Sequence, residues 1–226
     1  MTKSEICAHV DHTALKAFTT WKDVKKLCKE ALKYRFASVC IPPCYVKYVK
    51  EVYGDKITIC TVIGFPLGYE AALAKMMEAM QAVADGADEI DMVINVTDVK
   101  NGDFGKVRGE IGQIRAVTKG KTLKVIVETC YLSEEEKIEL CGIVTETGAD
   151  YIKTSTGFGT AGAAIEDVRL FKRHIGPSVK IKAAGGIKTL EDMERYVAEG
   201  CERIGTSSAV SLLNEESTKG HKKNTD

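Results

Sequence analysis

The stretch YIKTSTGF, residues 151–158, determines how the rest of the chain is interpreted. Tyr151 and Ile152 are strong β formers, and Gly148 just before them ends a helical pattern. The hydroxyl residues and the glycine that follow are typical of a loop at the carboxyl end of a strand. Lys153 lies at that junction. Burying an unpaired ammonium costs several kcal/mol or forces the group neutral. This lysine therefore either belongs to an ion pair, which is the commoner case, or has a chemical role.

The composition is that of a globular chain with enough apolar residues for one large α/β domain. Of its 226 residues 44% are hydrophobic, and 32 Lys and Arg balance 32 Asp and Glu. A formal net charge of zero, without a basic patch interleaved with aromatic residues, argues against a nucleic-acid partner. No apolar run approaches the roughly 18 residues that a membrane span needs, and the first residues do not form a signal peptide. We therefore expect no membrane partner and a cytoplasmic location.

The eight cysteines are spread along the chain without the spacing of a disulfide framework or a zinc site. Cys40 and Cys44 form one loose pair, and the four histidines do not complete a zinc set. Cys7, His9 and His12 lie close together in the sequence, but a metal ion there is the less favoured interpretation. We expect no metal site, and reduced thiols of which several fill the core.

Short apolar segments alternate with long amphipathic segments along the whole chain. The expected strands are residues 8–11, 37–41, 57–62, 89–93, 123–127, 151–153, 179–183 and 203–205. The expected helices are residues 21–34, 44–53, 69–85, 104–118, 133–147, 164–174 and 190–199. Strands separated by helices indicate βα units and a parallel sheet. Eight such units in a chain near the usual ~250 residues favour a closed (β/α)₈ TIM barrel.

The domain organisation follows from the same pattern. We expect one barrel domain over residues 1–213 and a polar, flexible tail over residues 214–226. Ser133 and the glutamates after it form a capping box, the clearest of the helix starts. A GxGxxG motif does not follow the first strand, which counts against a Rossmann domain.

Charged side chains cluster where the expected strands end. In such a barrel the catalytic groups come from the carboxyl ends of the strands. Side chains alternate along a strand, so Asp91 points into the barrel if its apolar neighbours pack on the helices. The same alternation brings Lys153 and Lys182 to this end, while Asp11 and Glu128 are expected to end the first and fifth strands. Converging by topology, these residues indicate an active site.

Two lysines close together have a specific chemical use. A like charge and partial desolvation both lower the pKa of a lysine, so that a fraction becomes free amine near neutral pH. A free amine attacks carbonyls and forms a Schiff base, which is an electron sink for breaking a neighbouring C–C bond. The alternative, that Lys182 simply pairs with Asp91 or Glu128, is compatible with this chemistry.

The loops after the last two strands are rich in small residues. Gly185 and Gly186 follow the seventh strand, and Gly205, Ser207 and Ser208 end the eighth before a short helical segment. Glycines allow backbone N–H groups to approach an anion, and a helix N-terminus adds a favourable dipole. Barrels of this kind usually hold phosphate at these two loops. We therefore expect a phosphate site there, the alternative being two tight turns.

The residues taken together resemble the deoxyribose-phosphate aldolase family of Schiff-base aldolases. The matching motifs run in family order over nearly the whole chain: DHT at 11–13, SVCIP at 38–42, VIGFPLG at 62–68, EIDMVIN at 89–95, IKTSTGF at 152–158, KAAGGI at 182–187 and GTSS at 205–208. The resemblance implies reversible cleavage of 2-deoxy-D-ribose 5-phosphate to D-glyceraldehyde 3-phosphate and acetaldehyde, in deoxyribose phosphate catabolism, without a metal or cofactor. It also implies a homo-oligomer, either a dimer or a tetramer.

The same resemblance assigns roles to individual residues. Lys153 is implied as the Schiff-base lysine and Asp91 as the proton donor and acceptor. Lys182 is implied as a second proton donor and acceptor, which also lowers the pKa of Lys153. The implied substrate contacts are Asp11, Thr13, Cys40, Thr156, Gly157, Gly185, Gly186, Gly205, Ser207 and Ser208.

Two positions depart from the pattern of some members. Phe158 stands where some members have a lysine after the glycine, and residues 218–226 lack the tyrosine with which some members end.

Two rival functions are weighed against this one. An isomerase or epimerase of another sugar phosphate would share the phosphate loops but would not need lysine at both 153 and 182. A regulatory protein that binds a phosphorylated metabolite would be expected to lose the acid and the two lysines, and here they are present.

Overall fold

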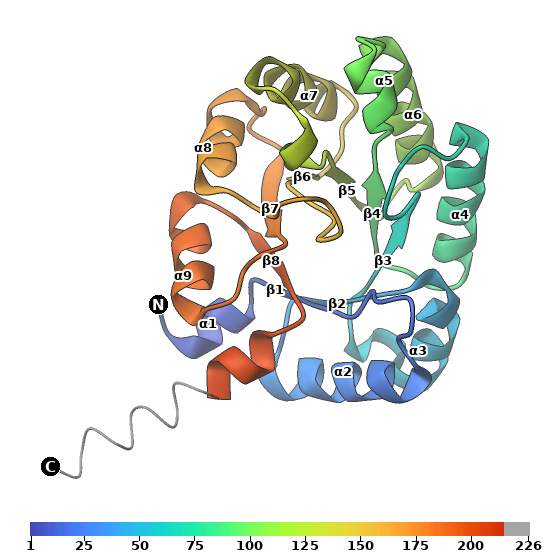
Figure 1. Cartoon of the computed structure of the whole chain (residues 1–226). Coiled ribbons are helices and arrows are strands. Elements are labelled where there is room, and N and C mark those ends of the chain that lie inside the picture. The colour runs from blue at the N-terminus through green and yellow to red at the C-terminus, as the bar shows by residue number, and fades with distance from the viewer. Residues whose placement is uncertain (215–226) are drawn as a thin grey trace, which may run out of the picture.

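Eight parallel strands close into a barrel at the centre of the computed structural model, which describes residues 1–214 (Figure 1). The strands are β1 (Val10–Thr13), β2 (Ser38–Ile41), β3 (Ile59–Ile63), β4 (Glu89–Val93), β5 (Thr122–Ile126), β6 (Tyr151–Lys153), β7 (Lys180–Ala184) and β8 (Arg203–Thr206). Each strand pairs with its neighbours in the chain, and β8 pairs with β1 to close the ring. The predicted single-domain (β/α)₈ barrel is confirmed.

The first strand lies two residues later than the expected 8–11. Helix α1 (Lys3–Cys7) occupies the segment before it and begins at Thr2, whose side chain caps the helix in a capping box. β1 is Val10–Thr13, so Asp11 lies inside the strand and not at its tip. The depth of Asp11 in the barrel was therefore wrongly predicted.

The helices form an outer layer around the barrel (Figure 1). All seven expected helices are present: α2 (Trp21–Tyr34), α3 (Val46–Tyr53), α4 (Ala72–Ala84), α6 (Phe104–Val117), α7 (Glu134–Glu146), α8 (Ile165–His174) and α9 (Leu190–Glu199). The predicted capping box at Ser133 is confirmed. Its side chain accepts a hydrogen bond from the N–H of Glu136 (3.2 Å), and the Glu136 carboxylate accepts one from the N–H of Ser133 (2.7 Å).

The short elements were not expected. They are α1, α5 (Val96–Lys100) and the 3₁₀ turns η1 (Pro43–Tyr45), η2 (Gly54–Lys56) and η3 (Thr129–Tyr131). Each spans three to five residues, which is too short for a helical period to show in the sequence.

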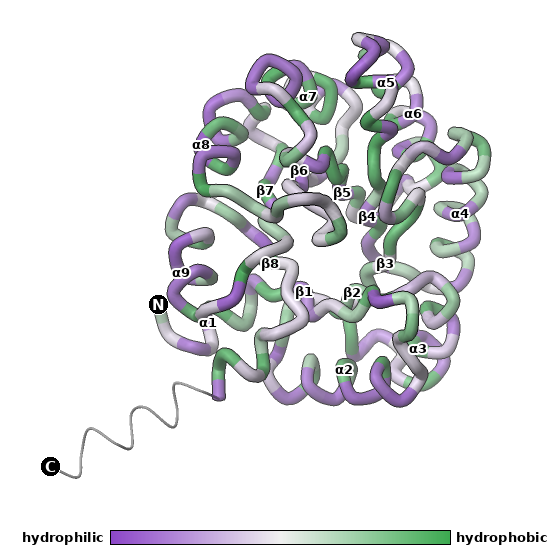
Figure 2. Tube along the Cα trace, viewed as in Figure 1, coloured by the Kyte–Doolittle hydropathy of each residue, from purple (hydrophilic) through white to green (hydrophobic). Residues whose placement is uncertain are grey.

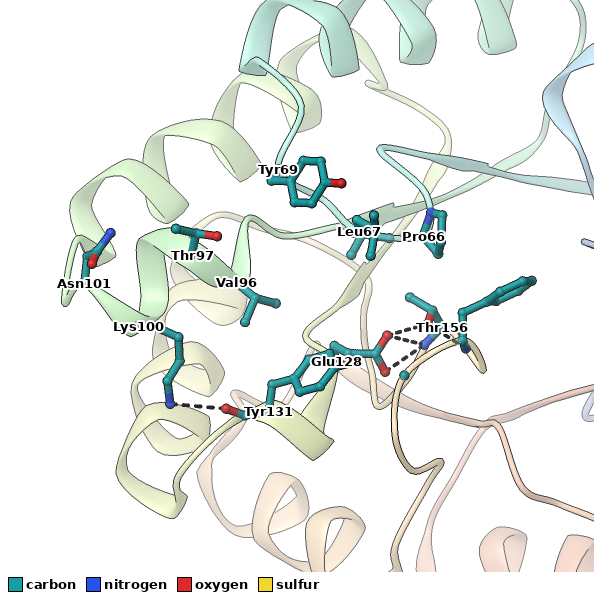
Figure 3. A pocket seen from close by; sticks show the side chains of 13 residues that line it. Pro66, Leu67, Tyr69, Val96, Thr97, Lys100, Asn101, Glu128, Tyr131 and Thr156 are labelled. Carbon is teal, nitrogen blue, oxygen red and sulfur yellow. Dashed lines mark hydrogen bonds between the residues drawn. The ribbon is translucent and has the colours of Figure 1, made fainter. Parts of the chain in front are cut away.

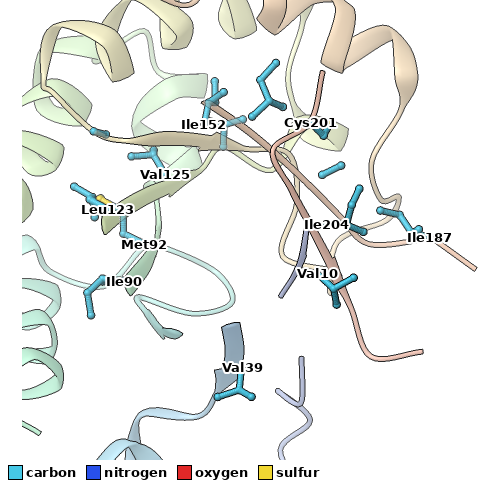
Figure 4. Close-up of a cluster of buried hydrophobic side chains, with 14 of the residues drawn as sticks. Val10, Val39, Ile90, Met92, Leu123, Val125, Ile152, Ile187, Cys201 and Ile204 are labelled. Atoms are coloured by element: carbon cyan, nitrogen blue, oxygen red, sulfur yellow. The ribbon is translucent and has the colours of Figure 1, made fainter. Parts of the chain in front are cut away.

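The apolar core lies between the barrel wall and the helices. Ile90 and Met92 on β4 and Ile152 on β6 are fully buried in one cluster (Figure 4). Ile111 of α6 and Leu140 of α7 belong to the same cluster. In Figure 2, green apolar segments run through the central strands, while the outer helices alternate between green and purple. Because side chains alternate along a strand, the residues between these apolar positions face the inside of the barrel.

The helices are short compared with the thickness of a membrane. Among residues 1–214 no helix is long and apolar enough to span a membrane. Most of the expected polar tail, residues 215–226, lies outside the described residues, while residues 209–214 are helical.

Candidate active site

A network of charged side chains is buried in the barrel beneath its mouth. Asp91 on β4 lies at its centre and is inaccessible to solvent. Lys153 on β6 and Lys182 on β7 are register partners in neighbouring strands. Their Nζ atoms each lie 2.7 Å from the same oxygen, Oδ2 of Asp91. The three residues with expected catalytic roles therefore meet at one carboxylate.

The network continues toward the amino-terminal ends of the strands. Asp11 on β1 forms ion pairs with Lys182, at 2.5 Å, and with Arg203. Arg203 begins β8 and also contacts Glu89, the first residue of β4, at 2.7 Å. The interior of the barrel is thus held together by ion pairs between strands that lie on opposite sides of it.

Lys124, which was not predicted from the sequence, completes the network. Its Nζ lies 2.8 Å from Oδ1 of Asp91 and 2.5 Å from Oε2 of Glu89. Lys124 lies on β5, where it is the register partner of Asp91 on β4, and it is fully buried. A signal was available, because Lys124 stands two residues before Ile126 and four before Glu128, on one face of the strand. Residues 123–127 were predicted as an apolar strand, and Lys124 was therefore not considered as a site residue.

The network has more cations than carboxylates. Its members are Asp11, Glu89, Asp91, Lys124, Lys153, Lys182 and Arg203, that is, three carboxylates and four cations. Loss of one proton from one lysine would make the network neutral.

Burial and ion pairing oppose each other in setting the pKa values of the network. Burial alone raises the pKa of Asp91, but Lys124, Lys153 and Lys182 outweigh it and hold this pKa well below its usual range. Burial alone lowers the pKa of Lys182, but the carboxylates of Asp11 and Asp91 outweigh it and raise that pKa. Lys124 is likewise raised by Asp91 against its burial. Lys124 and Lys182 therefore remain cations near neutral pH.

A cavity of about 730 Å³ opens at the mouth of the barrel above the network. Lys153 is the member of the network that lines it, with 3% of its surface exposed, whereas Lys182 and Asp91 have none. A molecule in the cavity therefore meets the amine of Lys153 first, with Asp91 directly behind it.

Most of the expected substrate contacts line the same cavity. They are Thr13, Thr156, Gly157, Gly185, Gly186, Gly205, Ser207 and Ser208. Asp11 and Cys40 do not line it, since both are buried in the barrel below. Lys16 and Lys188, which were not predicted as site residues, also line the cavity.

The two small-residue loops have the backbone that close approach requires. Gly185 and Gly186 have φ values of 81° and 75°, in the left-handed region that favours glycine. The backbone of Gly162 packs against Gly185, where an added Cβ on Gly162 would lie 2.3 Å from the carbonyl. Across the cavity, the N–H of Ser208 donates to Oγ1 of Thr206 just before the last helical segment. These loops expose backbone groups and small side chains to the cavity.

Two sets of donors in the network have spacings that suit a metal ion. Among the described residues 1–214, one set consists of Cys60, Asp11 and Glu89, and the other of Cys60, Cys40 and Asp91. In each set the possible ligand atoms lie within 4.8 Å of one another. All three carboxylates already form ion pairs with lysine or arginine, and Cys60 Sγ donates to Asp91 at 3.1 Å. Burial raises the pKa of the Cys60 thiol. A metal ion would therefore have to displace the cations that already neutralise its ligands.

A second cavity of about 370 Å³ lies beside the first (Figure 3). Its lining includes Leu67, Tyr69, Tyr131 and Glu128, and it shares Thr156 and Phe158 with the larger cavity. Figure 3 shows the Glu128 carboxylate hydrogen-bonded to Thr156, a residue that lines both cavities. Glu128 and Thr156 thus form part of the wall that separates the cavities.

A family model and the sequences of known proteins both relate this chain to aldolases. Residues 6–216 match the model of the DeoC/LacD family aldolase. The deoxyribose-phosphate aldolase of Clostridium botulinum (strain Alaska E43 / Type E3) is 60% identical, over 98% of this chain and 100% of the relative. That of Clostridioides difficile (strain 630) is 56% identical, over 92% and 95%.

Solved structures extend the likeness to three dimensions. A structure described as "QR15, an Aldolase" has a TM-score of 0.90 and 39% identity, covering 97% of this chain and 99% of its own. The tetrameric deoxyribose phosphate aldolase of Aeropyrum pernix has a TM-score of 0.88 and 30% identity, covering 96% and 92%.

Proposed function

This chain belongs to the DeoC/LacD aldolase family, and from that premise we propose that it reversibly cleaves 2-deoxy-D-ribose 5-phosphate to D-glyceraldehyde 3-phosphate and acetaldehyde. One observation carries the proposal. Lys153 faces the large cavity while its Nζ shares Oδ2 of Asp91 with Lys182. A nucleophile, a proton carrier and a fixed positive charge are thereby brought to one place.

Lys153 is the nucleophile. Its free amine attacks the C1 aldehyde of the open-chain sugar to give a carbinolamine, and loss of water gives a protonated imine. The network supports this role, because it contains one cation more than its carboxylates can neutralise. Of its lysines, Lys153 is the one that lines the cavity and whose proton can leave toward it.

Asp91 moves the protons. It accepts the proton of the C3 hydroxyl, through a water molecule, as the C2–C3 bond breaks and its electron pair enters the imine. This step releases D-glyceraldehyde 3-phosphate and leaves an enamine on Lys153. Protonation of the enamine at C2, followed by hydrolysis, gives acetaldehyde and the free amine. The 2.7 Å contact between Lys153 and Asp91 supports this assignment.

Lys182 keeps its charge throughout the cycle. Asp11 and Asp91 raise its pKa against the effect of burial, so it neither attacks a carbonyl nor accepts a proton near neutral pH. Its role is electrostatic: it orients Asp91 and places a fixed positive charge in the strand next to Lys153.

The loops after β7 and β8 hold the phosphate. Backbone N–H groups at Gly185 and Gly186 and the hydroxyls of Ser207 and Ser208 are the proposed ligands, and these residues line the cavity that Lys153 also lines. Lys188 follows the glycines in the same lining and supplies a positive charge. Binding at this end fixes the sugar so that its C1 lies against Lys153.

The wider setting is proposed from the family and the relatives. The reaction would belong to the breakdown of deoxyribose phosphate in the cytoplasm, and the chain would act as a homo-oligomer. The relative from Aeropyrum pernix is described as tetrameric. Light scattering after size-exclusion chromatography measures the assembly.

Borohydride reduction in the presence of acetaldehyde tests the proposed chemistry. Reduction traps the imine as an added two-carbon group, and peptide mass spectrometry gives its position. We expect the label on Lys153 alone. A label on Lys182, or cleavage of the sugar phosphate without any trapped imine, contradicts the proposal.

A further inference from the structure

Glu128 follows β5 in a backbone conformation that needs an explanation. Among the described residues other than glycine, Arg35 and Glu128 have positive φ values, 57° each. Arg35 is the C-cap of α2, a common place for this conformation. Glu128 precedes the 3₁₀ turn η3, and its side chain does not cap that turn. A left-handed backbone is unfavourable for a residue with a Cβ, and such positions concentrate at functional sites.

The side chain of Glu128 holds the loop that follows Lys153. Its carboxylate accepts a hydrogen bond from the N–H of Thr156, at 3.2 Å to one oxygen and 3.3 Å to the other, and a second bond from the Thr156 hydroxyl. The Thr156 hydroxyl in turn accepts the N–H of Phe158 at 3.0 Å. Figure 3 shows this carboxylate pointing at Thr156. A hydrogen-bonded clamp therefore joins the end of β5 to the loop over the mouth of the barrel.

The clamp is closely packed and buried. Glu128 is 3% exposed, and an added Cβ on Gly159 would lie 3.1 Å from its carboxyl carbon. The hydroxyl proton of Thr156 is donated to Glu128, so this hydroxyl has no proton left for a ligand. Thr156 therefore contributes to the cavity by fixing the shape of its loop.

The other end of the same loop rests on the proposed phosphate site. The N–H of Ala163 lies 3.1 Å from the carbonyl oxygens of both Ala184 and Gly185, and Gly162 packs on Gly185. The loop is thus fixed at Glu128 on one side and at Gly185 on the other, with Gly157 lining the cavity between them.

We propose that Glu128 is a positioning residue that fixes the loop 154–164 against Gly185 and so sets the affinity for the phosphorylated substrate. The inference rests on the proposed function, because it takes that substrate as the ligand. Glu128 does not contact the reacting carbons in this scheme. Losing it should therefore weaken binding of the sugar phosphate and leave imine formation at Lys153 nearly unchanged.

Glu128→Gly tests the proposal with Arg35→Gly as its matched control. Glycine fits both left-handed positions, so each variant relieves strain and is expected to fold. We expect Glu128→Gly to raise the KM for 2-deoxy-D-ribose 5-phosphate about tenfold, with kcat and acetaldehyde trapping at Lys153 within about threefold of wild type. Arg35→Gly should leave all three unchanged. A KM within twofold of wild type in Glu128→Gly overturns the proposal, as does a fall in trapping that matches the rise in KM.

Thr156→Val examines the other half of the clamp. It keeps the shape of the side chain but removes the hydroxyl that Glu128 holds. The double variant Glu128→Gly with Thr156→Val should have the KM of Glu128→Gly alone, because both changes open the same clamp. Fully multiplicative effects of the two changes would mean that the residues act separately, and would overturn the proposal.

Amide hydrogen exchange tests the clamp without reference to catalysis. The N–H groups of Thr156 and Phe158 should exchange at least about tenfold faster in Glu128→Gly than in wild type or Arg35→Gly. If the wild type fails to cleave the sugar phosphate, the proposed function is wrong, and this measurement still decides whether the clamp exists. Unchanged exchange at both amides overturns the inference even in an active aldolase.

Discussion

Buried lysines pair with carboxylates on both sides of the barrel wall, and the two sides differ in their charge balance. Outside the strands, Lys75 of α4 lies 2.8 Å from Glu110 of α6 and donates to the carbonyl of Val93 at 2.9 Å. This pair has one cation and one carboxylate. Inside the strands, the network around Asp91 has four cations and three carboxylates.

The difference separates a structural lysine from the lysine that we propose to be reactive. Lys75 is fully buried and its stem packs under Gly64, so no ligand can reach its amine. Lys153 is almost as deeply buried, yet it lines a cavity and belongs to a network with a surplus cation. Burial and ion pairing are common to both lysines. We attribute the proposed reactivity of Lys153 to the surplus charge together with its access to the cavity.

Removing the surplus lysine should have the largest effect. Lys153→Met leaves the network with three cations and three carboxylates and no nucleophile. We expect kcat/KM to fall at least about 10⁴-fold, as for other catalytic nucleophiles. The thermal midpoint should stay equal to that of wild type or rise. Steady-state kinetics and calorimetry on the same sample measure both quantities. A fall of several degrees in Tm would show that Lys153 stabilises the fold as Lys75 does.

Removing the charge at the centre of the network should come next. Asp91→Asn keeps the shape of the side chain but accepts no proton, and acid–base groups typically contribute about 10²–10⁴-fold. We expect a loss of that size in kcat and slow but detectable imine trapping at Lys153. Turnover like that of wild type would move the proton transfer to another group in the cavity.

On the outer side the expected loss is in stability and not in rate. Lys75→Met leaves Glu110 buried without its cation, and breaking such a pair costs about 3 kcal/mol. The raised pKa of Glu110 limits the cost, because the acid can take up a proton. We expect urea unfolding to show this loss, with kcat of the folded protein within about twofold of wild type. Adding Glu110→Gln should recover part of the stability, since it removes the unpaired charge.

Lys182→Met tests the charge count directly. The network would then hold three cations and three carboxylates, so it would no longer carry a surplus cation and would release a proton less readily. The acidic limb of the pH–rate profile should move up by about one unit, which leaves about tenfold less free amine at neutral pH, or about 1.4 kcal/mol. Activity should be partly regained in alkaline buffer. An equal loss at every pH would assign Lys182 to direct contact or proton transfer.

Glu89→Gln should move the same limb in the opposite direction. It removes a carboxylate, so the surplus grows from one cation to two, and a proton leaves the network more readily. The shift should be smaller than for Lys182→Met, because Glu89 pairs with Lys124 and Arg203 and not with Lys153. The pH–rate profiles of the two variants, recorded together, give opposite shifts if charge balance governs Lys153, and shifts of the same sign if it does not.

The sequence predicts the site better where side-chain chemistry marks a position than where depth in the barrel matters. Lys153, Asp91 and Lys182 were predicted together because strand alternation and strand ends are visible in the chain. Lys124 was missed because residues 123–127 were interpreted only as an apolar strand, although Lys124 shares a strand face with Glu128. Asp11 was placed too near the mouth, because strand boundaries are set by pairing with β2 and β8.

The fold shows the same division. The eight strands and seven long helices were predicted, since each is marked by a period or a cap. The left-handed backbone of Glu128 could not be predicted from the sequence, because the residue that usually indicates this conformation is glycine. Its contact with Thr156 joins residues 28 positions apart and depends on the completed barrel.

The pairing of β8 with β1 gives the order of folding a functional meaning. Every other strand pair joins chain neighbours, whereas Asp11 and Arg203 meet across 192 residues. Such distant contacts carry the largest loop-closure entropy and slow folding. A nascent chain without β8 holds Asp11 without Arg203, so its charge network is incomplete. During translation, the charge network is therefore completed only when the last strand is made.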